Sequence, residues 1–255
     1  MTEKQSTRDA PLILATDLDG TFAGGTSLAR RDLQEAIRCS PAATLIYVTG
    51  RSVPATREII AEAPLPQPDL LIADVGTTVV RGDDFQPLRE VQGTIEDLWP
   101  GADTVRHLFR DFPGIEEQEV RAPNRVSYWL REGAMEETLT HMTERLDDER
   151  LDLIGSAGVY IDVLPPGVNK GSTLLRVLDW LDVPGADVVV AGDTLNDLAL
   201  FETGLRGVVV SNCEAGLRDR LANRKHVYFA RGEGAAGVHE GLQFFGCLQG
   251  GADGE

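Results

Sequence analysis

Short apolar runs alternate with amphipathic segments over most of the chain. Five runs rich in β-branched residues are typical of buried strands: 12–16, 44–49, 70–73, 188–191 and 207–210. Segments with helical spacing follow four of these runs, at 28–39, 53–63, 195–202 and 214–222. Strands that alternate with helices in this way predict an α/β fold with a Rossmann-like parallel sheet.

This rhythm breaks between residues 82 and 165. The stretch contains two helical patterns, an alternating segment and two short strand candidates, at 94–112, 134–146, 125–131, 151–154 and 159–163. Helices and neighbouring strands without crossovers predict an inserted α+β cap domain. Glycine- and proline-rich turns at 82–84 and 165–167 mark its predicted hinges. We therefore expect a core of residues 1–81 and 166–255, a cap of residues 82–165, and frayed tails at 1–10 and 247–255.

Four polar motifs lie at or near the ends of the predicted core strands. The sequence DLDGT (17–21) follows the first strand, and TGR (49–51) follows the second. The sequence NKG (169–171) opens a helix after the insert, and GDTLND (192–197) follows the strand at 188–191. Ligands of open parallel sheets bind beyond the carboxyl ends of the strands, so these motifs predict one shared site.

The residue types in these motifs predict phosphoryl chemistry with a metal ion. Asp17, Asp193 and Asp197 form an oxygen-rich cluster suited to Mg²⁺, which would remove their mutual repulsion. A carboxylate beside Mg²⁺ can attack a phosphoryl group and form an aspartyl phosphate. Asp19 can protonate the leaving oxygen and later activate water.

Positive charge and hydrogen-bond donors are also available for a phosphoryl group. Lys170 offers a point charge, Thr49 a hydroxyl and Gly50 an unobstructed backbone N–H, and these are the predicted phosphate ligands. The same motifs place Arg51 and Asn196 beside the site as supporting residues.

The order of these motifs resembles the phosphatase branch of the haloacid dehalogenase superfamily, in the subclass with a large α/β cap. The resemblance covers residues 12–246. It implies that Asp17 is the nucleophile, that Asp19 is the acid and base, and that Thr49 and Lys170 hold the phosphate. It also implies Mg²⁺ on Asp17, the main-chain carbonyl of Asp19, Asp193 and, directly or through water, Asp197.

Within that subclass, three stretches are similar to sucrose phosphatases: VSYWL (126–130), GVYIDVLPPGVNKG (158–171) and GAAGVHEGLQFFG (234–246). The resemblance implies a disaccharide phosphate such as sucrose 6-phosphate. Close sucrose phosphatases are expected to carry Asp-Asn-Thr where this chain has Asp19-Gly20-Thr21. Glycine occurs there in related sugar-phosphate and glycosyl-glycerate phosphatases, so the sugar stays open. Arg125, Tyr128 and Trp129 in the cap are candidate sugar contacts, although a packed sheet would show the same pattern.

The bulk composition narrows the partners and the compartment. The 41 acidic and 24 basic residues give a net charge of −17, which disfavours binding to nucleic acid or an anionic membrane. The N-terminus lacks an apolar signal region, and no run is long enough to span a membrane. Three scattered cysteines, Cys39, Cys213 and Cys247, indicate free thiols in a reducing cytoplasm.

Three functions other than a phosphatase can be compared with the sequence. A phosphosugar mutase on the same fold would keep both aspartates of the first motif but conserve the phosphate. A catalytically silent binding module, working with a glycosyltransferase or synthase, would have lost the nucleophile or the lysine, and both are present at Asp17 and Lys170. A dinucleotide-binding protein is disfavoured because no G-x-G-x-x-G follows the first strand.

Overall fold

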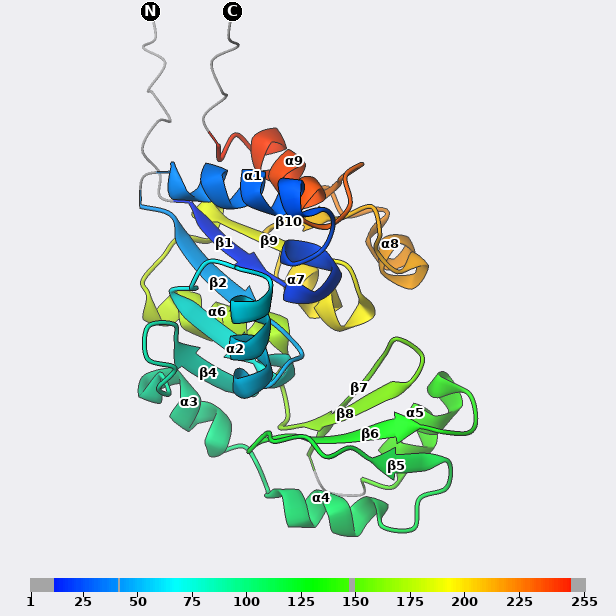
Figure 1. Ribbon diagram of the computed structural model, residues 1–255. Helices are drawn as coiled ribbons and strands as arrows, with labels where there is room; N and C mark the ends of the chain where they lie inside the picture. Colours follow the sequence, from blue (N-terminus) through cyan, green and yellow to red (C-terminus); the bar gives the residue numbers. More distant parts are fainter. Residues whose placement is uncertain (1–11, 41, 147–149, 249–255) are drawn as a thin grey trace, which may run out of the picture.

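The computed structural model describes residues 12–40, 42–146 and 150–248. The predicted tail at 1–10 and residues 249–255 of the predicted tail at 247–255 lie outside the described residues. Cys247 and Leu248, the first residues of the second predicted tail, instead pack half-buried against the hydrophobic core. The described chain forms a large sheet covered by helices and a smaller sheet below it (Figure 1).

The larger sheet has seven strands in the order β11-β10-β9-β1-β2-β3-β4. Its strands are β1 (Ile13–Thr16), β2 (Thr44–Val48), β3 (Leu70–Ala73), β4 (Thr78–Arg81), β9 (Val188–Gly192), β10 (Arg206–Val209) and β11 (Val227–Phe229). All neighbours are parallel except β3 and β4. The predicted α/β fold and its five core strands are confirmed, whereas β4 and β11 were not recognised from the sequence.

Helices cover both faces of this sheet because strand residues alternate between two hydrophobic clusters. Ile13 and Ala15 of β1 point into one cluster, and Leu14 points into the other. The helices are α1 (Ser27–Arg38), α2 (Val53–Glu62), α3 (Arg89–Glu96), α6 (Lys170–Trp180), α7 (Leu198–Glu202), α8 (Ala215–Leu221) and α9 (Gly234–Phe244). Helices α1, α2 and α9 pack on one face, and α3, α6, α7 and α8 pack on the other.

The cap is a four-stranded antiparallel sheet with two helices on one face. Its strands run in the order β5-β6-β8-β7 and are β5 (Ile115–Glu117), β6 (Val126–Leu130), β7 (Asp152–Ser156) and β8 (Tyr160–Leu164). Val126 and Tyr128 of β6 pack with α4 (Ala102–Phe109) and α5 (Met135–Glu144) in a separate hydrophobic cluster. Ser127 and Trp129 therefore lie on the opposite face of the sheet.

The predicted helix at 94–112 is wrong, because two helices occupy this stretch. The break falls at Pro100 and Gly101, where proline cannot continue a helix and glycine adopts a φ of 101°. Val91 and Ile95 of α3 belong to a core cluster, whereas Val105 of α4 belongs to the cap cluster. The domain boundary at residue 82 stays a prediction, and this packing favours a junction at 97–101 instead.

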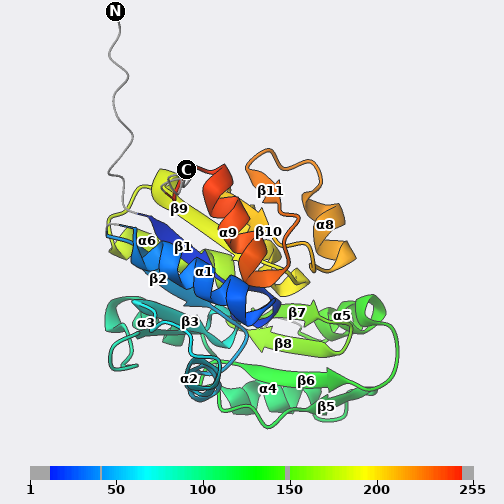
Figure 2. The ribbon, with the colours of Figure 1, turned by 45° about the horizontal axis from the view of Figure 1, so that its top comes forward.

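The cap sheet faces the carboxyl ends of the core strands. Strand β7 packs against the short 3-10 helix η4 (Leu195–Asp197), which directly follows β9. Both ribbon views place β7 and β8 as the cap strands nearest to the core (Figures 1 and 2). No helix in the described ranges is long and apolar enough to cross a membrane.

Candidate active site

Three buried carboxylates meet at the carboxyl edge of the core sheet. Strands β1 and β9 are neighbours in register, with Thr16 beside Ala191, so the residues that follow them are close together. Asp17 anchors this position through its N–H, which donates to the carbonyl of Ala191 (2.9 Å). Asp17, Asp193 and Asp197 each offer an oxygen within 4.8 Å of the others. The predicted acidic cluster is thus assembled from two strand ends and η4.

Lys170, the first residue of α6, has no exposed surface and lies against this cluster. Its ammonium donates to Oδ1 of Asp17 (2.7 Å), Oδ1 of Asp197 (2.6 Å) and Oδ1 of Asn196 (2.9 Å). These bonds use all three N–H groups of a lysine. A phosphoryl oxygen would therefore have to replace one of them, and the role of Lys170 as a phosphate ligand stays a prediction.

Both carboxylate oxygens of Asp197 already have protein partners. Oδ1 accepts from Lys170, and Oδ2 accepts from the backbone N–H groups of Asp193 and Thr194 (both 3.0 Å). The Oγ1 of Thr194 also donates to Oδ2 (3.3 Å). Asp197 therefore fixes the loop that carries Asp193, and this arrangement favours contact with a metal through water rather than directly.

Gly20 and Thr21 bring the first loop against Asp193. The hydroxyl of Thr21 donates to Oδ1 of Asp193 (3.1 Å). Gly20 has a φ of 74°, and a Cβ at this position would lie 2.1 Å from Oδ2 of Asp193. A larger residue at this position would therefore require the Asp193 carboxylate to shift, and the positive φ favours glycine.

Burial makes the negative charges of the cluster unfavourable without a cation. Desolvation raises the pKa of Asp17 well above its ordinary value, although Lys170 opposes this shift. Desolvation, together with the charge of Asp197, raises the pKa of Asp193 to about 7. Burial alone would lower the pKa of Lys170, but Asp17 and Asp197 outweigh it and hold that pKa above the ordinary lysine value.

The donor set fits a small divalent cation. Three carboxylates share one lysine, and hard oxygen donors are the ligands that Mg²⁺ prefers. Asp17 and Asp193 have oxygens that are not committed to Lys170, so these two residues would hold the ion. A bound Mg²⁺ would stabilise both charged carboxylates and the charge that develops on a phosphoryl group.

The loop after β2 carries the predicted phosphate ligands Thr49 and Gly50. The buried Oγ1 of Thr49 accepts from the backbone N–H of Arg51 (3.1 Å). Arg51 in turn binds Asp19 through two bonds, from Nε and Nη2, of 2.7 Å each. This ion pair is partly exposed and contributes at most about 1 kcal/mol, so Asp19 can exchange it for another partner.

Two of the three candidate sugar contacts have other partners in the structure. Tyr128 is buried in the cap cluster and makes an edge-on contact with Phe109 (6.0 Å between ring centroids). Arg125 is 7% exposed and is paired with the carboxylates of Asp74 and Asp162. Neither position supports the predicted sugar contact, because one side chain packs behind the sheet and the other joins cap to core.

Trp129 remains on the helix-free face of the cap sheet. It lies beside Tyr160 of β8, with ring centroids 4.8 Å apart. The guanidinium of Arg131 lies 5.2 Å from the ring centre of Trp129 and forms an ion pair with Glu116 (2.7 Å). Tyr160 was missed in the sequence, although its place opposite Trp129 in the next strand of the pattern is the signal that would have found it.

Asn212 is another site residue that sequence reasoning missed. Its Nδ2 donates to the carbonyl of Gly20 (2.9 Å), and its Oδ1 accepts from the N–H of Gly234 (2.8 Å). Asn212 follows β10 at the same edge as Asp17 and Asp193. The signal in the sequence that indicates this role is the position of the polar Asn212 just after the predicted strand at 207–210.

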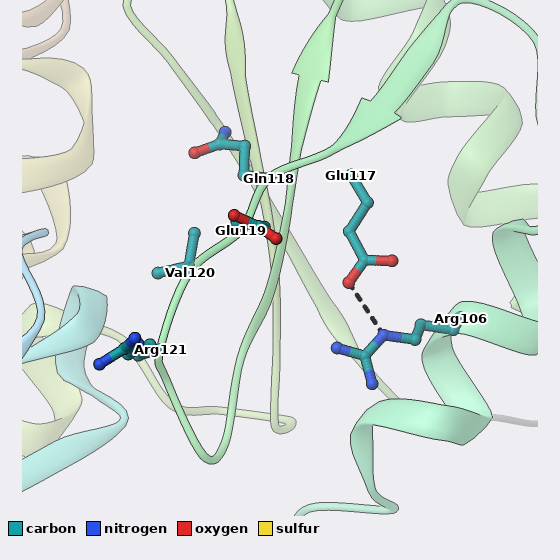
Figure 3. Close-up of a pocket in the computed structure, with 6 residues that line it drawn as sticks. All are labelled: Arg106, Glu117, Gln118, Glu119, Val120 and Arg121. Carbon is teal, nitrogen blue, oxygen red and sulfur yellow. Dashed lines mark hydrogen bonds and ion pairs between the residues drawn. The ribbon is translucent and has the colours of Figure 1, made fainter.

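A separate pocket of about 520 Å³ lies at one edge of the cap, between α4 and the segment after β5 (Figure 3). It is lined by Arg106, Glu117, Gln118, Glu119, Val120 and Arg121. Its charged groups are partly paired, since Arg106 donates to Glu117 (2.8 Å). The pocket includes none of the carboxylates or phosphate-loop residues, so it is distinct from the candidate active site.

Comparison with protein families gives a match over nearly the whole chain. The model of the sucrose-6F-phosphate phosphohydrolase family matches residues 10–246. Among solved structures, the sucrose-phosphatase from Synechocystis sp. PCC6803 in complex with sucrose and phosphate superposes with a TM-score of 0.84. The two share 27% identity, and the match covers 93% of this chain and 99% of the other.

Curated relatives include proteins of similar and of greater length. The chain is 40% identical to a glucosylglycerol-phosphate synthase from Pseudomonas anguilliseptica over 93% of its own length but 31% of the relative's. It is 30% identical to the mannosylfructose-phosphate phosphatase of Agrobacterium fabrum, over 92% of this chain and 96% of the relative. With sucrose-phosphatase 1 of Nicotiana tabacum it shares 28% identity and spans 60% of the relative.

Proposed function

The chain belongs to the sucrose-6F-phosphate phosphohydrolase family, and from that premise we propose that it is a Mg²⁺-dependent phosphatase of a sugar phosphate. The observation that carries the proposal is the cluster of Asp17, Asp193 and Asp197 around Lys170, at the edge where the family motifs converge. A nucleophilic carboxylate, a buried cation and a metal-ligand set are the parts that phosphoryl transfer requires.

In the proposed reaction, a carboxylate oxygen of Asp17 attacks phosphorus while the ester P–O bond to the sugar breaks. Once Arg51 releases one of its two bonds to Asp19, Asp19 in its protonated form donates its proton to the leaving sugar oxygen. A water molecule then attacks phosphorus and the P–O bond to Asp17 breaks, while Asp19 accepts a proton from the water and returns to its protonated form. Inorganic phosphate leaves, and the Asp17 carboxylate is restored.

The phosphate loop and the cap would hold the two ends of the substrate. The N–H of Gly50 and the hydroxyl of Thr49 can donate to phosphoryl oxygens, since no acceptor for that hydroxyl occurs among the described residues. Trp129 and Tyr160 offer aromatic faces for the C–H groups of a sugar ring, and Arg131 and Glu116 offer polar groups for its hydroxyls.

Two sugar phosphates stand out as substrates. A disaccharide phosphate such as sucrose 6-phosphate agrees with the family match and with the solved relative that holds sucrose and phosphate. Glucosylglycerol phosphate is the second candidate, because the relative at 40% identity is named for its synthesis. On the basis of that relative's name, we also propose that a synthase produces the sugar phosphate that this chain hydrolyses.

A phosphate-release screen tests the proposal. Purified protein with Mg²⁺ is incubated with sucrose 6-phosphate, mannosylfructose phosphate, glucosylglycerol phosphate and monosaccharide phosphates. We expect stoichiometric inorganic phosphate from at least one of them, and loss of this activity after chelation with EDTA. A phosphosugar mutase would instead conserve the phosphate and give an isomeric sugar phosphate, and a silent binding module would give no turnover of any substrate.

We also propose a cytoplasmic location. The three cysteines are free thiols, as a reducing compartment allows. Fractionation of cells that produce the chain tests this, and activity confined to a membrane or extracellular fraction would contradict it.

A further inference from the structure

Arg125 joins the cap to the core through a buried set of contacts. It directly precedes β6 of the cap, and its Nη1 donates to Asp162 of β8 (3.2 Å). Its Nη2 donates to Asp74, which follows β3 of the core (3.2 Å). The exposed fractions of Arg125, Asp74 and Asp162 are 7%, 1% and 6%. A cation shared by carboxylates of two domains holds those domains together in this arrangement.

The same guanidinium also reaches the phosphate loop. Nη1 of Arg125 donates to the carbonyl of Gly50 (3.2 Å), whose own N–H is a predicted phosphate ligand. The peptide that starts with this carbonyl ends in the N–H of Arg51, which is bonded to Thr49 (3.1 Å). This peptide plane is therefore fixed at both ends, by the cap on one side and by Thr49 on the other.

The core segment that carries Asp74 is itself bonded to that loop. The N–H of Asp74 donates to the carbonyl of Arg51 (2.9 Å), and the N–H of Val75 donates to the carbonyl of Thr49 (3.1 Å). Asp74 and Val75 both have positive φ angles, 54° and 60°. Such backbone strain in non-glycine residues costs about 1–3 kcal/mol each and persists only where surrounding contacts enforce it.

A continuous chain of contacts thus runs from the cap to Asp19. Arg125 donates to Asp162 of the cap and to the carbonyl of the Gly50–Arg51 peptide. The guanidinium of Arg51 then donates to the carboxylate of Asp19. Nε of Arg125 is buried without a partner in the described part of the chain. A buried N–H without a partner costs stability, so these contacts do not use the full hydrogen-bonding capacity of Arg125.

We propose that Arg125 is a positioning residue that couples the position of the cap to the geometry of the phosphate loop and of Asp19. The inference rests on the proposed phosphatase function. When the cap lies against the core as it does here, Arg125 orients the Gly50 carbonyl and with it Thr49, Arg51 and Asp19. When the cap moves away, the loop loses this support, so binding of a sugar in the cap promotes the chemical step.

The variant Arg125→Lys tests this coupling, because lysine keeps the charge but lacks the planar fork that reaches several acceptors. With the sugar phosphate that the wild type hydrolyses best, we expect kcat to fall at least ~10-fold and KM to change less than about threefold. With para-nitrophenyl phosphate, which has no sugar to engage the cap, we expect both constants within about twofold of wild type.

Arg106→Lys is the matched control, because Arg106 of the cap helix α4 forms a partly exposed ion pair with Glu117 (2.8 Å), away from the candidate active site. It should leave kcat with both substrates unchanged. Asp162→Asn, which keeps the shape of the side chain but removes the cap-side charge, should lower kcat in the same direction as Arg125→Lys. This second variant keeps the test decisive if Arg125→Lys does not fold, which thermal unfolding would reveal.

Hydrogen–deuterium exchange decides the inference independently of turnover. The backbone N–H groups of Arg51, Asp74 and Val75 are bonded within the coupled loop, and we expect them to exchange at least ~10-fold faster in Arg125→Lys than in Arg106→Lys. Unchanged exchange, or equal loss of kcat with both substrates, would overturn the coupling. Absence of sugar-phosphate turnover by the wild type would contradict the proposed function instead, while the exchange measurement would still judge Arg125.

Discussion

Two buried clusters in this molecule each hold one cation between two carboxylates, yet they differ in where their parts come from. Lys170 binds Asp17 and Asp197, and all three belong to the core. Arg125 binds Asp74 of the core and Asp162 of the cap. The Lys170 cluster can therefore form without the cap, whereas the Arg125 cluster exists only when cap and core are in contact.

The two clusters also differ in how completely the cation is satisfied. Lys170 uses all three N–H groups, but Nε of Arg125 has no partner among the described residues. Desolvation raises the pKa of Asp74 to about 6 in spite of Arg125. The chemical centre is therefore preorganised, while the contact between domains is held less firmly and can be exchanged.

The largest expected effect comes from the nucleophile. Asp17→Asn keeps the size and the buried position of the side chain but cannot form an aspartyl phosphate. We expect phosphate release to fall by a factor of at least ~10⁴ while the chain stays folded. Phosphate release and thermal unfolding measure the two properties, and near-wild-type turnover would refute Asp17 as the nucleophile.

Replacing Lys170 or Arg125 with an uncharged residue should lower the free energy of unfolding by different amounts. Lys170→Met leaves Asp17 and Asp197 buried and unpaired, and we expect the free energy of unfolding to fall by about 3–5 kcal/mol. Arg125→Met should cost less, because the cap can move and let water reach Asp74 and Asp162. Urea denaturation measures both, with Arg131→Met as an exposed control expected to change stability by less than about 1 kcal/mol. A larger loss of unfolding free energy for Arg125→Met than for Lys170→Met would contradict this expectation.

The core cluster should also bind Mg²⁺ in a pH-dependent manner. The metal needs the charged carboxylate, and the pKa of Asp193 is raised to about 7, so protons compete with Mg²⁺ below that pH. With this pKa, the apparent Mg²⁺ affinity should be roughly tenfold weaker at pH 6 than at pH 8. Calorimetric titration at the two pH values measures it, and Asp193→Asn should remove most of the difference. Equal affinities in the wild type would contradict this raised pKa.

The smallest expected effect lies on the cap face beside Asp162. Trp129→Ala removes one aromatic face from the proposed sugar site, and we expect KM for the sugar phosphate to rise about fivefold with kcat nearly unchanged. Tyr128→Phe is the control, since Tyr128 lies on the opposite face of the same strand, in the cap core. Steady-state kinetics distinguish them, and an equal rise in KM for both variants would remove the sugar role of Trp129.

Much of the fold and of the core site could be predicted from local patterns. Asp17, Thr49 and Asp193 each follow a buried strand, and parallel strands bring their carboxyl ends to one edge. The sequence also contains the signal for the helix break, the Pro100-Gly101 pair, but the apolar spacing on either side of this pair is typical of one continuous helix. Strand β4 is as long as β1 and β3, but it pairs antiparallel with β3 without an intervening α-helix, so the alternation of strands and helices does not reveal it. Strand β11 has only three residues and gives a weak periodic signal.

The sequence by itself determined the α/β core, the insertion of a cap and the convergence of the acidic motifs with Lys170, because these follow from the alternation of strands and helices. Only the tertiary structure decided the partner of each side chain in the cap. Arg125, Tyr128 and Trp129 lie within five residues of one another, yet one binds the core, one packs in the cap core and one contacts Tyr160 on the helix-free face of the cap sheet. Strand periodicity separates the two faces, but it does not show which face meets the core or which distant carboxylate, such as Asp74, lies opposite Arg125. Those depend on how the two domains pack against each other.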